Sequence, residues 1–237
     1  MGKRSYRQYC GLAASLDVVG ERWALLIVRD LVPGPRRFSD LLAGLPGLAT
    51  DVLTERLRAL EAAGAVEQRR VKHPVPAQLY ALTERGEELA AIAGTLAQWG
   101  MPLLPPPSAA EAAGYRREPR WALQAMARRY RGGLPHGEYR LTIGDDELRV
   151  DVAAGRARVR YGHGEGAPTM HLVCSDEVFF DHVGRAAAAA AGRSPRAAGK
   201  RGVVVVGSDA EVDAFFAALP APATAPRRSV STASSTE

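Results

Sequence analysis

The sequence predicts an α+β protein that folds in two parts, with a proline-rich segment between them. Leucines recur at helical spacing between residues 50 and 63, and two short strand-like segments follow this helix. Further segments between residues 139 and 174 alternate apolar with polar residues, which is the pattern of half-buried strands. With 237 residues, the chain is long enough for two domains.

The helix predicted over residues 50–63 has one face for a core and one for solvent. Leu53, Leu57 and Leu60 stand at positions i, i+4 and i+7, so they share one inward stripe. Gly64 suits the position after the helix because it adopts the left-handed conformation without strain. The outward face carries short hydroxyls, a carboxylate and a guanidinium, which belong to Thr50, Asp51, Thr54 and Arg58.

A β-hairpin is predicted next, with strands over residues 65–71 and 78–82 and two prolines at its tip. Prolines lack a backbone donor, so the tip should project as a loop. A polar-faced helix followed by a hairpin is the order of a winged helix-turn-helix, whose helix enters the major groove of DNA. Arg69, Arg70 and Lys72 would then lie over phosphates. The alternative is a basic hairpin that only keeps the protein in solution.

Between Tyr9 and Gly100, a series of short segments stands at characteristic spacings from one another. They are Tyr9-Cys10, Leu16–Gly20, Arg22–Ile27, Arg29–Leu31, Gly34-Pro35, Arg37-Phe38, Leu45–Gly47, Leu53-Thr54, Arg56-Leu57, Tyr80–Thr83 and Gly86. This pattern resembles the HxlR-type winged helix-turn-helix regulators, a MarR-like group. The resemblance implies a cytoplasmic homodimer that binds double-stranded operator DNA and regulates transcription.

Two positions depart from the usual pattern of that family. Ala49 stands where a serine commonly opens the recognition helix, so the cap must come from Thr50, from the Leu48 backbone or from a phosphate. Asp51 stands where polar or basic residues are common, and a carboxylate repels phosphates unless it accepts a cytosine amino group. The alternative is that Asp51 only favours the positive end of the helix.

Arg36 and Arg37 precede a short helix predicted over residues 38–43, the first of the helix-turn-helix pair. Because this helix crosses the DNA backbone, we expect both arginines at phosphates. Ser39 would either cap the helix or donate to a phosphate.

Two further helices, over residues 11–20 and 84–100, carry apolar stripes too long for so small a domain to cover. The stripes consist of Leu12, Leu16 and Val19, and of Leu89, Ile92, Leu96 and Trp99. We expect them to form the homodimer interface, and the alternative is an intramolecular core.

The predicted domain boundaries follow from these patterns. Residues 1–101 would form the DNA-binding and dimerisation domain, 102–118 an extended proline-rich linker, 119–219 an effector domain and 220–237 a disordered tail. The net charge of +5 allows nucleic-acid binding without requiring it. No apolar run is long enough to span a membrane, so we expect a cytoplasmic protein without a membrane partner.

The second domain should place helices on one mainly antiparallel sheet. The order of its elements, with Asp176–Phe180, Gly199–Gly202 and Val206–Ala210, resembles the sterol-carrier-protein-like fold, which encloses an apolar tunnel. That resemblance implies a site for a hydrophobic small-molecule effector, lined by some of Trp121, Met126, Tyr139, Leu141, Phe179 and Phe215. The alternative is that these side chains fill a solid core.

Nothing in the sequence predicts an enzyme, a metal site or a cofactor, because the histidines and cysteines lack ligand spacing. Cys10 is a redox candidate, because some HxlR-type proteins sense oxidants through a cysteine at this place, and Lys3, Arg4 and Arg7 could lower its pKa. The alternative functions are therefore a redox-sensing regulator, or a small-molecule or lipid carrier whose winged helix serves only for association.

Overall fold

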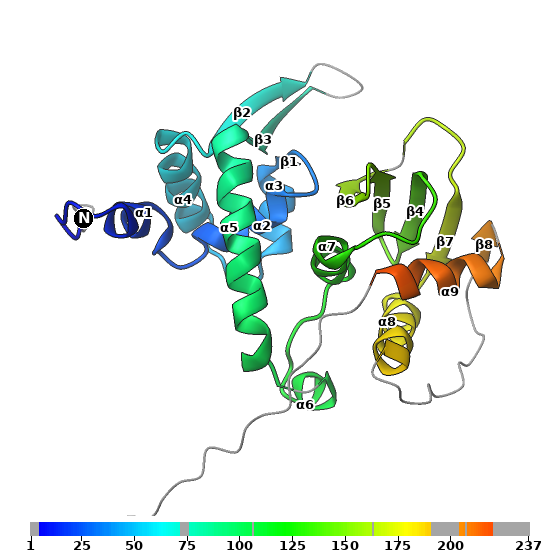
Figure 1. Ribbon diagram of the computed structural model, residues 1–237. Helices are drawn as coiled ribbons and strands as arrows, with labels where there is room; N and C mark the ends of the chain where they lie inside the picture. The colour runs from blue at the N-terminus through cyan, green and yellow to red at the C-terminus, as the bar shows by residue number, and fades with distance from the viewer. Residues whose placement is uncertain are drawn as a thin grey trace, which may run out of the picture.

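The computed structural model describes residues 5–71, 76–105, 107–162, 164–190, 204–206 and 208–219. These residues form two sheets, each with its own hydrophobic core and helices (Figure 1). The N-terminal sheet has three strands and the C-terminal sheet has five.

The N-terminal part is a winged helix. Its elements are α1 (Gly11–Val19), α2 (Ala24–Leu31), β1 (Arg36–Arg37), α3 (Phe38–Gly44), α4 (Thr50–Ala62), β2 (Val66–Val71), β3 (Ala77–Leu82) and α5 (Glu84–Gly100). Strand β3 lies between β1 and β2 and is antiparallel to both. The predicted recognition helix and hairpin are therefore confirmed as elements, whereas the pairing of β1 with the hairpin adds a strand that the sequence analysis did not predict.

The C-terminal region is a five-stranded sheet with helices. It contains α7 (Pro119–Arg129), β4 (Gly137–Ile143), β5 (Asp146–Ala153), β6 (Arg156–Tyr161), β7 (Met170–Cys174), α8 (Asp176–Ala190), β8 (Val204–Val206) and α9 (Asp209–Ala218). The strand order is β6-β5-β4-β7-β8. The predicted antiparallel meander β4-β5-β6 is confirmed, and β7 pairs parallel with β4.

One face of the larger sheet is covered by helices, which lie together along its lower side in Figure 1. Side chains alternate along the strands, so Leu141, Leu148 and Val150 point into the core while their neighbours face outward. Phe179 of α8 and Phe215 of α9 close this core, and both are fully buried. The opposite face of the sheet is polar.

The segment between the two parts differs from the extended spacer that its prolines predicted. It contains a short 3₁₀ turn, η1 (Met101–Leu103), and a helix, α6 (Pro107–Ala112). Proline is compatible with the first turn of a helix because the amide that it lacks has no partner there. Residues 220–237, which the sequence analysis interpreted as a disordered tail, lie outside the described residues.

The six residues predicted to line an effector tunnel divide between a packed core and the contact with the winged helix. Five of them are at most 3% exposed and belong to one packed core, namely Met126, Tyr139, Leu141, Phe179 and Phe215. The rings of Tyr139 and Phe215 are 5.4 Å apart, which is ordinary aromatic packing. Trp121 lies outside this core and contacts the winged helix, so its assignment to the tunnel was wrong.

Candidate nucleic-acid interface

The recognition helix α4 is held by three leucines and presents a polar face to solvent. Leu53, Leu57 and Leu60 are at most 2% exposed in the N-terminal core. On the other side, Thr50, Asp51 and Arg58 are exposed and Thr54 is half-buried. The leucines and the polar residues lie on opposite sides of α4. Because the leucine side is buried in the core, the polar side is the one that a bound partner can contact.

The two ends of α4 are built differently. At the C-terminal end Gly64 has φ +71°, and Ala65 N–H donates to Leu60 O at 2.9 Å, which is a Schellman arrangement. At the N-terminal end Ala49 is the cap residue, and no side chain caps the helix. Of the three sources of a cap weighed from the sequence, the Thr50 hydroxyl does not act as one. The first amides of α4 remain suited to an anion such as a phosphate.

Thr54 makes a local hydrogen bond that restricts what it can do at an interface. Its hydroxyl donates to Thr50 O at 2.8 Å. The proton is therefore used within the helix, and the oxygen lone pairs remain available to accept from a base amino group. Asp51 lies in the first turn of α4, where its carboxylate faces the positive helix end.

The wing presents arginines on β2. Arg69 is ion-paired with Glu67, with Arg69 Nη2 2.6 Å from Glu67 Oε1, yet its side chain remains about half exposed. Arg70 is exposed on the neighbouring position. Exposed ion pairs are weak, so the Arg69 guanidinium can exchange its carboxylate for a phosphate at little cost. Lys72, the third basic residue assigned to the wing, lies outside the described residues.

The two arginines of β1 point in different directions. Arg37 is exposed beside the start of α3. The Arg36 guanidinium instead stacks 4.6 Å from the Tyr161 ring centre and donates to the Tyr161 hydroxyl at 2.8 Å. Successive side chains of a strand face opposite sides, which separates Arg36 from Arg37. The structure therefore places Arg36 against the C-terminal region and not at the predicted phosphate contact.

Ser39 is exposed, but it does not cap α3. Its hydroxyl donates to Asp40 Oδ1 at 3.2 Å, and the Asp40 carboxylate accepts from Arg37 N–H at 3.3 Å. Asp40 thus caps α3, which was one of the two roles expected for Ser39. Of the two expectations for Ser39, only a contact with phosphate remains.

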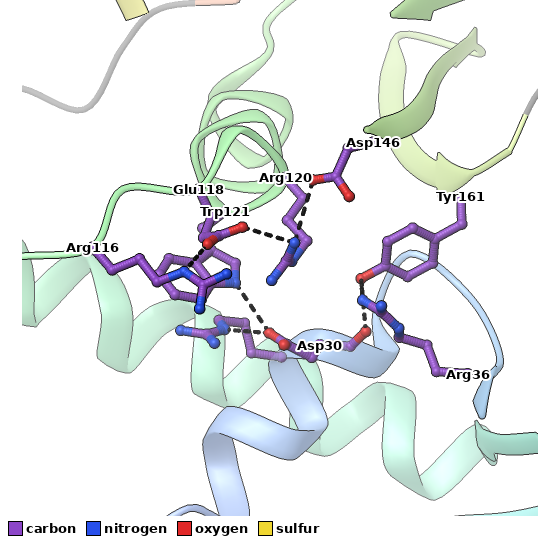
Figure 2. Close-up of polar contacts among 9 residues, drawn as sticks. Asp30, Arg36, Arg116, Glu118, Arg120, Trp121, Asp146 and Tyr161 are labelled. Atoms are coloured by element: carbon purple, nitrogen blue, oxygen red, sulfur yellow. Dashed lines mark hydrogen bonds and ion pairs between the residues drawn. The ribbon is translucent and has the colours of Figure 1, made fainter. Parts of the chain in front are cut away.

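A buried carboxylate joins the winged helix to the C-terminal region, as Figure 2 shows. Asp30 of α2 is fully buried, and its Oδ1 accepts from Arg29 Nε at 2.8 Å and from Trp121 Nε1 at 3.1 Å. The Tyr161 hydroxyl donates to the Asp30 carbonyl at 3.1 Å. We call Asp30, Arg29, Arg36, Trp121 and Tyr161 the Asp30 cluster. Burial raises the pKa of Tyr161, so its hydroxyl stays protonated and can donate.

Two glycines allow the two parts to approach closely, and one of them lies beside the Asp30 cluster. A Cβ atom at Gly44 of α3 would lie 3.0 Å from Asp30 Oδ2 and 3.4 Å from Arg120 Nη2. On α5, the Arg128 guanidinium of α7 lies against Gly94 and donates to Ala90 O at 3.2 Å. The C-terminal region therefore contacts α2, β1 and α5, and it lies close to the end of α3.

An apolar surface remains exposed on α1 and α5. The exposed fractions are 69% for Leu12, 65% for Ile92 and 70% for Trp99, and Leu16 and Leu96 are also exposed. Exposed apolar side chains along helices indicate an interaction surface. The core of this part of the chain leaves these side chains uncovered, as expected if they pack on another molecule.

The two cysteines lie in contrasting environments. Cys10 is exposed before α1, and hydrogen bonds from the backbone of Ala13 and then Leu12 lower the pKa of its thiol. Burial, with a smaller effect of Asp176, raises the pKa of Cys174 to about 11. The expected cause at Cys10 was wrong in part, because helix amides and not Arg7 lower the pKa. Lys3 and Arg4 lie outside the described residues.

Residues 18–107 match the family model of the HxlR-like helix-turn-helix. The HTH-type transcriptional regulator YvaP of Bacillus subtilis is 40% identical over 93 residues, which are 39% of this chain and 85% of that protein. YkvN of the same organism is 36% identical over 91 residues, which are 38% of this chain and 77% of that protein. The reduced form of the transcriptional regulator YodB from B. subtilis is 30% identical over 39% of this chain and 92% of that chain, with a TM-score of 0.36.

The chain belongs to the HxlR-like helix-turn-helix family. It is a transcriptional regulator with a helix-turn-helix DNA-binding domain, and its curated relatives are regulators rather than enzymes, as expected. The match ends at residue 107, so it does not include the five-stranded sheet. Among the described helices of this HxlR-type regulator, none is long and apolar enough to cross a membrane.

The Asp30 cluster generates a prediction for stability. The substitution Tyr161→Phe removes the hydroxyl that accepts from Arg36 and donates to the Asp30 carbonyl. We expect it to lower the free energy of unfolding by about 1–3 kcal/mol, because buried partners lose their hydrogen bonds. Urea denaturation followed by tryptophan fluorescence measures this change. Tyr115→Phe, at an exposed position, is the matched control; equal stability of the two variants would contradict this description of the interface.

Proposed function

We propose that this HxlR-type regulator is a homodimer whose two α4 helices enter successive major grooves of a roughly palindromic operator. The observation that carries the proposal is the polar face of α4, which three buried leucines turn outward next to the basic wing. Helix-turn-helix dimers read half-sites one helical turn apart in this way. The carrier alternative, in which the winged helix only mediates association, predicts no retardation of DNA in a gel-shift assay.

The interface residues divide into two groups by their reach. Thr50, Asp51, Thr54 and Arg58 on α4 are proposed to contact base edges or phosphates inside the groove. Arg37, Ser39, Arg69, Arg70 and Lys72 are proposed to contact phosphates beside it. Arg36 is not part of the proposed interface, because its guanidinium donates a hydrogen bond to the Tyr161 hydroxyl.

The homodimer is proposed to form through the exposed apolar side chains of α1 and α5. Leu12, Ile92 and Trp99 are each at least 65% exposed, and the exposure of such apolar side chains to water is unfavourable. A second copy would cover them through a twofold interface, in which the same patch serves both subunits.

The C-terminal region is proposed to be an effector module. We place the domain boundary in residues 102–118 and retain the sterol-carrier-like architecture as a proposal, supported by the helices on one face of a mainly antiparallel sheet. A hollow of about 390 Å³ lies between the two parts, and its walls combine apolar residues such as Val32, Ala90 and Ala127 with the charged Glu87, Arg128, Arg158 and Arg160. Gln124 also lines it, and its buried Nε2 has no partner within the described residues. A hydrophobic ligand there would alter DNA affinity only by binding two states unequally.

Two arginines of the winged helix provide a matched test of the DNA-binding proposal. We expect Arg58→Ala to weaken operator binding by about 1–3 kcal/mol and to relax base preference, because Arg58 reaches base edges. We expect Arg70→Ala to leave the preference unchanged and to reduce the slope of log K against log salt by about 0.9, because one phosphate contact is lost.

Fluorescence anisotropy with the upstream region of the gene, titrated with salt, measures both effects. Each variant removes one exposed arginine, so the two share the same change in net charge. Binding isotherms identical to those of the unmodified protein for both variants would contradict the assignment of the interface.

A second candidate function is redox sensing through Cys10. The observation that favours it is the exposed thiol at the start of α1, whose pKa is lowered by backbone hydrogen bonds. A thiolate is the reactive form of cysteine, so Cys10 is better suited to react with an oxidant than the buried Cys174. Cys10 also adjoins the apolar surface on α1 that is proposed for the dimer.

Alkylation and oxidation test this second candidate. At neutral pH we expect iodoacetamide to modify Cys10 and to leave Cys174 unmodified in the folded protein, as mass spectrometry would record. Plotted against pH, the alkylation rate at Cys10 should reach half of its maximum at a pH below the ordinary thiol pKa, because the pKa of this thiol is lowered in the folded protein. If Cys10 is the sensor, hydrogen peroxide will change DNA affinity in Cys174→Ser and not in Cys10→Ser. A peroxide response in both variants would exclude Cys10 as the sensor.

A further inference from the structure

The outward face of the five-stranded sheet concentrates arginines on three neighbouring strands. We call this set the arginine face: Arg140 of β4, Arg149 of β5, and Arg156, Arg158 and Arg160 of β6. Each alternates with inward residues such as Leu141, Leu148 and Val159, which are buried in the core. The helices cover the opposite face of the sheet. Within the arginine face, Arg156 and Arg158 are exposed and the other three arginines are half-buried. Arg158 and Arg160 also line the hollow between the two parts.

The strand register places like charges directly opposite one another. Arg140 pairs with Arg149, and Arg149 pairs with Arg160, which gives a row of three arginines across three strands. Like charges at such positions destabilise a sheet. Carboxylates compensate the positive charge of two of these arginines. Glu138 Oε1 lies 2.5 Å from Arg140 Nε, and Asp151 Oδ1 lies 3.3 Å from Arg149 Nε.

The positive charges of the three arginines on β6 are not compensated in this way. Asp151 lies directly across from Arg158 in the register, but it forms its ion pair with Arg149. Among the described residues, no carboxylate forms an ion pair with Arg156, Arg158 or Arg160. Uncompensated positive charge therefore gathers on β6, at the edge of the sheet.

This edge lies next to the winged helix. Tyr161, the last residue of β6, donates its backbone N–H to Pro33 O at 3.3 Å and contacts Arg36 of β1. Figure 1 places β6 as the strand of the larger sheet nearest to α3 and β1. The neighbour of Arg36 is Arg37, which is proposed to contact a phosphate. Positive charge is therefore present on both sides of the junction between the two parts.

We propose that the arginine face binds the phosphate backbone of DNA that flanks the operator, as a second contact surface of the regulator. The inference rests on the proposed function and extends it from the winged helix to the C-terminal region. Guanidinium groups match phosphate geometry and accept its charge without a change of protonation. Charge complementarity selects this partner, because duplex DNA is a regular array of phosphates and the β6 arginines lack carboxylates of their own.

The alternative explanation is that the charges on β6 only prevent this edge strand from pairing with another chain. It makes a different prediction for DNA binding, since edge protection needs no contact with DNA. The two explanations can therefore be separated by the salt dependence of binding.

The test compares two double variants of equal charge. R156Q/R158Q removes two exposed arginines of the arginine face, and R117Q/R131Q removes two exposed arginines from other surfaces. Binding to a duplex of roughly 40 bp, about four helical turns from the upstream region, is measured by anisotropy over a range of salt concentrations without added small molecule. We expect R156Q/R158Q to reduce the slope of log K against log salt by about 1.8, at about 0.9 per contact. R117Q/R131Q should leave the slope unchanged, and R156K/R158K should restore most of it.

Other outcomes overturn the inference in distinguishable ways. An unchanged slope for R156Q/R158Q, or the same change in R117Q/R131Q, removes the arginine face as a DNA contact. If Arg58→Ala still weakens binding in that case, the proposed function survives without this inference. If the unmodified protein binds no DNA, the proposed function and the inference both fail. Thermal denaturation confirms that each double variant is folded, which is expected because the substituted side chains are exposed.

Discussion

The burial of Leu53, Leu57 and Leu60 determines what α4 can present to a partner. These side chains are fixed in the N-terminal core, so rotation of the helix would expose them to water and bury the polar residues instead. Each leucine contributes about 1.5–3 kcal/mol by leaving water, which is more than the polar face could recover by packing inward without partners. The wing and the Schellman turn at Gly64 then follow in positions set by this one orientation.

The Asp30 cluster connects that DNA-binding unit to the rest of the chain. A buried carboxylate is stabilised by the hydrogen bonds that it accepts, and Trp121 of the C-terminal region supplies one of the two hydrogen bonds to Asp30 Oδ1. Tyr161 holds both the Asp30 carbonyl and Arg36 of β1. A displacement of the C-terminal region would therefore leave polar groups on α2 and β1 unpaired. This is a physical route by which a second region of the chain can influence the elements beside DNA.

Local periodicity made much of the fold predictable from the sequence. The leucine spacing of α4, the proline-tipped hairpin and the alternation of β4, β5 and β6 each appear within a few consecutive residues. Contacts between distant residues left no such signal. Arg36 and Tyr161 are 125 positions apart, and Asp30 and Trp121 are 91 positions apart. From the sequence, Arg36 was therefore expected at a phosphate and Trp121 in the wall of a tunnel. The parallel pairing of β7 with β4 was missed for the same reason.

The central claim is that the polar face of α4 enters the major groove in two copies of the chain. Protection of guanine N7 atoms from dimethyl sulfate tests it most directly, because N7 lies in the major groove. On the upstream region of the gene, the account predicts two groups of protected guanines about 10 bp apart, on one side of the duplex. Salt-sensitive binding that leaves every guanine N7 reactive would contradict it.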